Sequence, residues 1–143
     1  MKKYVGTLLL FLFFAAITNA QKISPKNVPS PVSSSLKKKY PDASKVTWEK
    51  EKGNYEANWG GREGEDHSVQ FSADGTFIEQ VNAIPVSGLP ASVHTYVQQH
   101  YKGAKITEAG KVTDAQGKTF YEAELQHKDL LFDEKGNFIK KED

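Results

Sequence analysis

Apolar residues recur every four positions in two short segments of the chain. They are Val32, Leu36 and Tyr40 in the first segment and Val93, Val97 and Tyr101 in the second. This spacing places the three side chains of each segment on one side of an α-helix. Pro29 and Pro90 stand just before these sets, where the start of a helix tolerates proline. The pattern predicts two amphipathic helices of about three turns, which must pack on another element to be stable.

The residues that follow each predicted helix alternate between apolar and polar, with the period of a half-buried β-strand. The strand-like runs are 46–48, 55–59, 68–71 and 76–78 in the first half, and 106–112, 119–127, 128–132 and 137–140 in the second. Asp74-Gly75 separates two of these runs, and such a pair is a strong signal for a hairpin. Each half of the chain therefore predicts one helix followed by four antiparallel strands.

The two halves are copies of one unit. Tyr40 aligns with Tyr101 at a shift of 61 positions, and Tyr-Glu-Ala at 55–57 aligns with the same tripeptide at 121–123 at a shift of 66. The change of shift indicates that loops between strands differ in length, which surface loops tolerate. We predict a polar arm at 21–27, a first repeat at 28–83 and a second repeat at 88–143. The expected fold class is α+β: two tandem helix-plus-four-strand antiparallel repeats, with the helices packed on one face of the sheet.

The first twenty residues have the pattern of a secretory signal peptide. Lys2 and Lys3 form a basic start, Val5 to Ile17 carries no charge, and small or polar residues lead to Ala20. The apolar stretch is shorter than the roughly 20 residues of a membrane span. We therefore predict a signal peptide at 1–20 and a periplasmic or secreted protein, and the alternative is an uncleaved N-terminal anchor.

Composition narrows the function classes. The chain has 143 residues with no cysteine, which excludes a disulfide framework, thiol nucleophiles and cysteine zinc sites. Its 19 basic and 18 acidic residues nearly balance, so charge gives no support for a nucleic-acid partner. Four histidines are present, but their spacing forms no metal-binding motif, and we expect neither a metal nor another cofactor.

The doubled pattern resembles the PepSY-like family. The residues that carry the resemblance are Leu89-Pro90 with Val93 and Tyr101, the Tyr-Glu-Ala strands, and the segment from Phe132 to Phe138. The resemblance covers nearly all of 28–143. It implies the fold of the β-lactamase inhibitor proteins, in a small exported bacterial protein. It supplies no catalytic residues to carry over, and fold alone does not carry function.

Two carboxylates occupy matching positions, Glu56 and Glu122, and Glu124 follows on the same side of its strand. One interpretation is a paired acid–base site of the glycosidase kind. The other is the polar face of a half-buried sheet, where alternating charges are expected. The second interpretation is favoured, because no neighbouring residue in the sequence suggests a raised pKa.

A glycine-rich loop follows Trp59 and contains Arg62 among several acidic residues. It lacks the Gly-Lys-Ser/Thr ending of a phosphate loop. An aromatic residue and a mobile arginine are the groups on which interfaces often depend. The alternative is a plain hairpin loop, with Trp59 as the last core residue of its strand.

These observations favour a non-enzymatic binding module that presents the sheet face opposite the helices to a protein or peptide partner. An inhibitor is one form of such a module. By strand alternation this face carries Thr47, Glu49, Glu56, Asn58, Ser68, Gln70, Phe120, Glu122 and Glu124. Phe120 is expected to be its exposed aromatic, and the candidate binding residues are Arg62, Phe120, Glu56, Glu122 and Trp59. The alternative is a small-molecule or cation-sensing module that uses the acidic face, and an enzyme built on Glu56 and Glu122 is the third hypothesis.

The leader makes the first testable prediction. Mass spectrometry of the protein recovered from its native host is expected to give a chain that starts at Gln21, because cleavage follows Ala20. An intact residue 1–20 segment in the mature protein would contradict it.

Overall fold

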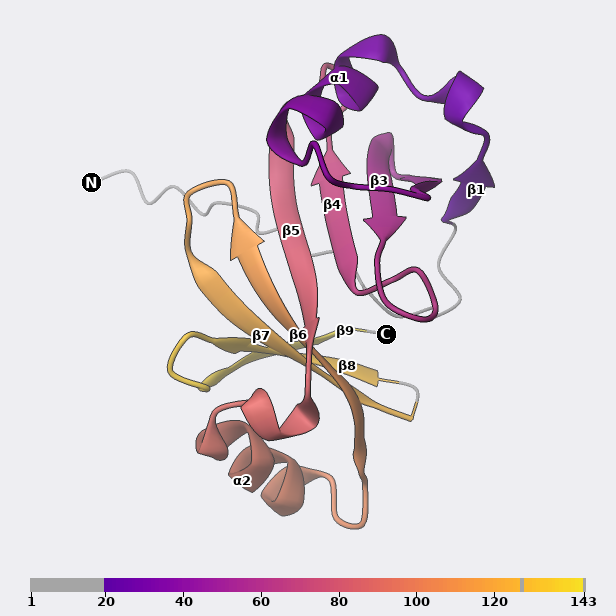
Figure 1. Cartoon of the computed structure of the whole chain (residues 1–143). Helices are drawn as coiled ribbons and strands as arrows, with labels where there is room; N and C mark the ends of the chain where they lie inside the picture. Colours follow the sequence, from indigo (N-terminus) through magenta and orange to yellow (C-terminus); the bar gives the residue numbers. More distant parts are fainter. Residues whose placement is uncertain (1–19, 127, 143) are drawn as a thin grey trace, which may run out of the picture.

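A computed structural model describes residues 20–126 and 128–142, which form one antiparallel sheet and two α-helices (Figure 1). The predicted signal peptide lies outside the described residues except for Ala20. The strands are β1 (Gln21–Ile23), β2 (Thr47–Glu51), β3 (Asn54–Trp59), β4 (His67–Phe71), β5 (Phe77–Ile84), β6 (Ile106–Asp114), β7 (Thr119–Leu125), β8 (Lys128–Asp133) and β9 (Phe138–Glu142). Every strand pairs with its neighbour in sequence, so the sheet runs in the order β1 to β9.

The two helices have the length and the buried stripe that the spacing predicts. α1 (Ser30–Lys39) buries Val32 and Leu36, and α2 (Ala91–His100) buries the matching valines Val93 and Val97. The helices end in the same way, because the N–H groups of Tyr40 and Tyr101 donate to carbonyl oxygens of the preceding turn, at 2.7 and 2.8 Å. Short 3₁₀ turns, η1 (Pro25–Asn27) and η2 (Val86–Gly88), lead into the two helices.

The repeat is visible in the structure, as α1 with β2–β5 and then α2 with β6–β9. β5 pairs with β6 from Glu79↔Asp114 to Ile84↔Ala109, and this pairing joins the two repeats into one sheet. The predicted polar arm differs from expectation. Its first residues form β1, which pairs with β2 through Ile23↔Trp48, and Ile23 packs against the core beneath α1. A strand at the edge thus extends the first repeat.

Both helices cover the same face of the sheet, as predicted. Tyr40 at the end of α1 donates a hydrogen bond to Gln80 of β5, and Ile84 of β5 packs against the core beneath α2. Residues 80 and 84 point to the same side of a strand because side chains alternate. In Figure 1, α1 lies at one end of the sheet and α2 at the other.

Each helix covers a separate apolar core. Trp48, Tyr55, Val69 and Phe71 pack beneath α1, with Val32 and Leu36 from the helix itself. The core beneath α2 has the corresponding composition: Leu89, Val93, Val97, Ile106, Ala109, Ala123, Leu125, Leu130 and Phe132. Burial of these side chains is the main force that holds each short helix on the sheet.

The hairpin turn between the last two strands of each repeat contacts the start of its helix. Gly75 has φ +86° and Gly136 has φ +79°, a conformation that glycine adopts without steric cost. The hydroxyl of Ser35 donates to the Gly75 carbonyl at 2.7 Å, and the hydroxyl of Ser92 donates to the Lys135 carbonyl at 3.1 Å. The turn and the helix therefore fix each other in both repeats.

Replacing Gly75 by alanine is expected to destabilise the protein more than the same change at Gly117. Both glycines have positive φ, which costs alanine about 1 kcal/mol. A Cβ at Gly75 would also lie 2.5 Å from the Pro31 carbonyl oxygen, whereas at Gly117 it meets nothing within 4 Å. Urea unfolding is expected to show a loss of about 1 kcal/mol for Gly117→Ala and at least about 2 kcal/mol for Gly75→Ala. Equal losses of unfolding free energy in the two variants would show that the contact between Gly75 and Pro31 of the helix does not contribute.

Candidate functional site

The strand register defines a helix-free face, the side of the sheet that points away from both helices. Cross-strand pairs place Thr47 beside Asn58 and Glu49 beside Glu56, and Glu56 beside Gln70 on the next strand. The residues on this face include Thr47, Glu49, Glu51, Glu56, Asn58, Ser68, Gln70, Glu79, Val81, Glu108, Val112, Asp114, Phe120, Glu122, Glu124, Asp129, Leu131 and Asp133. The predicted set therefore shares one face, and it is joined by further residues from β5, β6 and β8.

Phe120 is not the exposed aromatic that alternation predicted. It points away from α2 as expected, but it is 2% exposed in the full-length chain. Val112 is its direct cross-strand partner, and with Val81 and Leu131 these residues form an apolar strip of almost fully buried side chains. Apolar side chains on adjacent strands bury one another, so truncation of Phe120 is expected to destabilise the protein rather than leave its stability unchanged.

A signal for this strip is present in the sequence. Leu130-Leu131-Phe132 is continuously apolar, and such a run is typical of a strand that is buried on both sides. Leu130 and Phe132 pack beneath α2, while Leu131 belongs to the apolar strip.

Glu56 and Glu122 are not brought together. They lie on β3 and β7, which are separated by β4, β5 and β6 in the sheet. Four steps between strands correspond to roughly 19 Å along the sheet. Paired glycosidase carboxyls stand at most about 9.5 Å apart, so the acid–base hypothesis for this pair is wrong. Matching positions of a tandem repeat in one sheet are necessarily far apart.

The helix-free face is strongly acidic around its apolar strip. Its carboxylates include Glu49, Glu51, Glu56, Glu79, Glu108, Asp114, Glu122, Glu124, Asp129 and Asp133. Among the described strand residues on this side, the basic ones are Lys22 and Lys140. Since the whole chain is nearly neutral, its acidic groups are concentrated on this side of the sheet.

Burial raises the pKa of Glu56 to about 7, from a usual value of 4.5. Desolvation is the largest cause, hydrogen bonds to Asn58 and Ser68 act in the opposite direction, and the neighbouring Glu49 and Glu51 raise the pKa further. The carboxyl is thus costly to ionise where it stands. The sequence alone gave no sign of this shift, because it depends on strands that are distant in the chain.

Trp59 points to the helix side of the sheet, where it packs against the core beneath α1. It therefore does not belong to the helix-free face. Arg62 is exposed in the loop that follows, between β3 and β4. The predicted binding residues are thus divided between two places, with Glu56, Phe120 and Glu122 on one face and Trp59 on the other.

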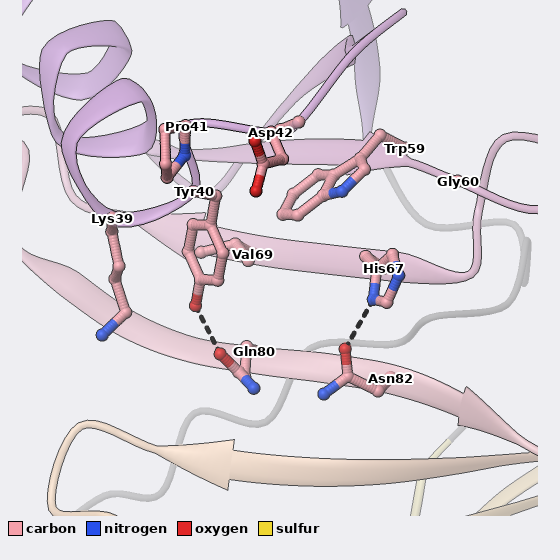
Figure 2. A pocket seen from close by; sticks show the side chains of 11 residues that line it. Lys39, Tyr40, Pro41, Asp42, Trp59, Gly60, His67, Val69, Gln80 and Asn82 are labelled. Carbon is pink, nitrogen blue, oxygen red and sulfur yellow. Dashed lines mark hydrogen bonds between the residues drawn. The ribbon is translucent and has the colours of Figure 1, made fainter.

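Trp59 contributes to a pocket at the end of α1, which we call the first-repeat pocket (Figure 2). Its volume is about 510 Å³, and its lining includes Lys39, Tyr40, Asp42, Trp59, His67, Gln80 and Asn82. The Trp59 ring lies 5.3 Å from the Tyr40 ring and 5.5 Å from the His67 ring, centroid to centroid. Sequence reasoning missed this site, because its residues come from one helix end and three strands.

Two amides of β5 form the polar side of the first-repeat pocket. The Tyr40 hydroxyl donates to Gln80 Oε1, and His67 Nδ1 lies 2.7 Å from Asn82 Oδ1. Figure 2 shows both hydrogen bonds ending on β5, one from Tyr40 at the end of α1 and one from His67 on the neighbouring strand β4. Burial raises the pKa of Tyr40 to about 12, so the hydroxyl stays protonated at neutral pH and remains a donor.

The second repeat has a pocket in the matching place, with a different lining. It has a volume of about 560 Å³ and is lined by Tyr101, Leu125 and Lys128, among others. Tyr101 matches Tyr40. Leu125 and Lys128 are cross-strand partners as Trp59 and His67 are, so leucine replaces tryptophan and lysine replaces histidine. The fold produces the hollow twice, but the aromatic and amide lining occurs in the first repeat.

Within residues 20–126 and 128–142, no group of three or more His, Asp or Glu side chains is arranged to hold a metal ion. In the same part of the chain, no helix is long and apolar enough to cross a membrane.

Comparison with known proteins identifies the family. Residues 16–79 and residues 62–140 each match the family described as "Putative beta-lactamase-inhibitor-like, PepSY-like". The chain belongs to the PepSY-like family. The two matches confirm the resemblance inferred from the sequence and the tandem repeat, and the description of the PepSY-like family names no catalytic activity. No curated protein matches the chain in sequence.

Solved structures share the PepSY-like fold. One, from Bacteroides eggerthii and described as among "putative periplasmic proteins", has a TM-score of 0.69 at 20% identity, over 80% of this chain and 88% of that one. A BLIP-like protein from Bacteroides fragilis has a TM-score of 0.61 at 23% identity, over 80% of this chain and 86% of that one. At these identities the likeness establishes the α+β fold of the chain.

Glu56 makes the stability of the protein depend on pH. Its pKa is raised in the folded state, so the unfolded chain loses its proton first as pH rises from 4.5, and folding stability falls until about pH 7. Glu56→Gln is expected to remove this fall, which is on the order of 3 kcal/mol for a pKa raised from 4.5 to about 7. Urea unfolding of both proteins at several pH values measures it. The raised pKa would be contradicted if the difference in unfolding free energy between the wild type and Glu56→Gln stayed constant from about pH 4 to pH 8.

Proposed function

We propose that this PepSY-like protein is an exported, non-enzymatic binding module. Its helix-free face takes a protein or peptide partner that carries basic groups. The observation that carries the proposal is the concentration of carboxylates around the apolar strip, on the one side of the sheet that neither helix covers.

Charge supports this choice of partner. An acidic face on a nearly neutral protein attracts basic partners and repels acidic ones, which sets specificity and association rate. Glu49, Glu51 and Glu124 are partly exposed and Glu108 is exposed in the full-length chain, so these carboxylates are the accessible ones.

The family supports the class of function without naming the partner. The PepSY-like description is inhibitor-like, and inhibition of an enzyme is one way in which a bound partner would be affected. Glu56 and Glu122 do not form a catalytic pair in this arrangement, which favours binding over catalysis. Export to the periplasm follows from the leader pattern and agrees with the description of the Bacteroides eggerthii relative.

The test is affinity capture from the periplasm of the native host with the chain that starts at Gln21. Two charge reversals on the helix-free face, Glu49→Lys and Glu124→Lys, are compared with Glu63→Lys, which reverses an exposed acid in the loop between β3 and β4. We expect the wild type and Glu63→Lys to capture the same protein, and each face variant to bind it at least tenfold more weakly. The binding should also weaken with added salt.

Equal capture by all four proteins would exclude the helix-free face as the interface. If only Glu63→Lys lost capture, the interface would lie on the loop that contains Arg62 and not on the helix-free face. Circular dichroism of each variant separates lost binding from lost folding.

A further inference from the structure

The first-repeat pocket has a lining that the fold does not require. The corresponding pocket of the second repeat forms with Leu125 and Lys128 in the places of Trp59 and His67. Trp59 is partly exposed and His67 is exposed, and the fold also forms with leucine and lysine at these two positions. The aromatic and polar residues of the first-repeat pocket need another explanation than stability.

Hydrogen bonds fix the direction of the pocket's two amides. Gln80 accepts from the Tyr40 hydroxyl through Oε1, and Asn82 Oδ1 is bonded to His67 Nδ1. With the oxygens engaged, the amide nitrogens are the groups left to donate to a ligand. If His67 donates from Nδ1, its Nε2 is an acceptor. The pocket thus offers donors and an acceptor beside an aromatic wall.

The charges around the pocket favour a neutral ligand. The lining contains one lysine, Lys39, and one carboxylate, Asp42, and their charges cancel. The Lys39 ammonium also lies 4.3 Å from the centre of the Phe77 ring, a cation–π contact that engages it outside the pocket. The remaining polar groups are amides, a hydroxyl and an imidazole.

We propose that the first-repeat pocket binds a neutral sugar ring. A pyranose has an apolar face of C–H groups that packs on an indole ring, as Trp59 offers. Its neighbouring hydroxyls both donate and accept, which matches side-chain amides and a histidine in fixed orientations. A volume of about 510 Å³ lies within the range of about 300–1,000 Å³ for small-ligand sites. The site lies on the helix side of the sheet, so the proposal is independent of the protein-binding function.

The test uses the chain that starts at Gln21 and a glycan array that contains neutral and acidic oligosaccharides, followed by calorimetric titration with the neutral sugars that bind. Trp59→Leu and His67→Lys give the first-repeat pocket the residues of the second. Each is expected to weaken binding at least tenfold, with a matching loss of ligand-induced change in tryptophan fluorescence for Trp59→Leu. Lys128→His in the second pocket is the matched control and is expected to bind as the wild type does.

Absence of any neutral sugar among the bound glycans would overturn the proposal, and so would binding of acidic glycans alone. Wild-type affinity in both Trp59→Leu and His67→Lys would place the sugar elsewhere. Should Trp59→Leu unfold, Asn82→Ala replaces it, because that change removes a donor and leaves the aromatic wall. Retention of wild-type affinity in folded Asn82→Ala would then count against the site.

Discussion

The antiparallel pairing of β5 with β6 is the constraint on which the rest of this structure depends. It joins the last strand of one repeat to the first strand of the next, so that two small units share one sheet. Because β5 contributes Gln80 to the surroundings of α1 and Ile84 to the core beneath α2, both helices must lie on the same side. The opposite side then has neither helix over it. Its chemistry is therefore free to differ from that of the cores, and it carries the carboxylates and the apolar strip.

The same pairing separates the features that the repeat duplicates. Glu56 and Glu122 occupy equivalent strands and end up four strands apart, which makes them two acids of one broad face. The pockets at the ends of α1 and α2 lie in separate repeats and have different linings. Comparison of the two copies therefore separates residues that the fold requires from those that it does not, because a required residue recurs in both. Tyr40 and Tyr101 recur, as do Gly75 and Gly136, whereas Trp59 and His67 do not.

The helix-free face and the first-repeat pocket use different physical means of recognition. The face is broad and acidic, and its attraction to a basic partner acts over the range of electrostatic forces. The pocket is small and neutral, and its selectivity depends on hydrogen bonds in fixed directions. The two sites lie on opposite sides of the sheet, so a partner on one does not block the other.

The sequence by itself determined the repeat, the two helices, the four strands of each unit and the face on which Phe120 lies, because periodicity and turn residues act over a few positions. It did not determine that Phe120 is buried, since this depends on Val81, Val112 and Leu131 from three other strands. It placed Glu56 on the helix-free face but did not indicate that its pKa is raised. That shift arises from desolvation in the assembled sheet. It identified Trp59 but not its pocket, because Tyr40, His67 and Asn82 meet it only when a helix end and three strands come together. Tertiary structure decided these features because burial and pocket lining depend on contacts between residues far apart in the chain.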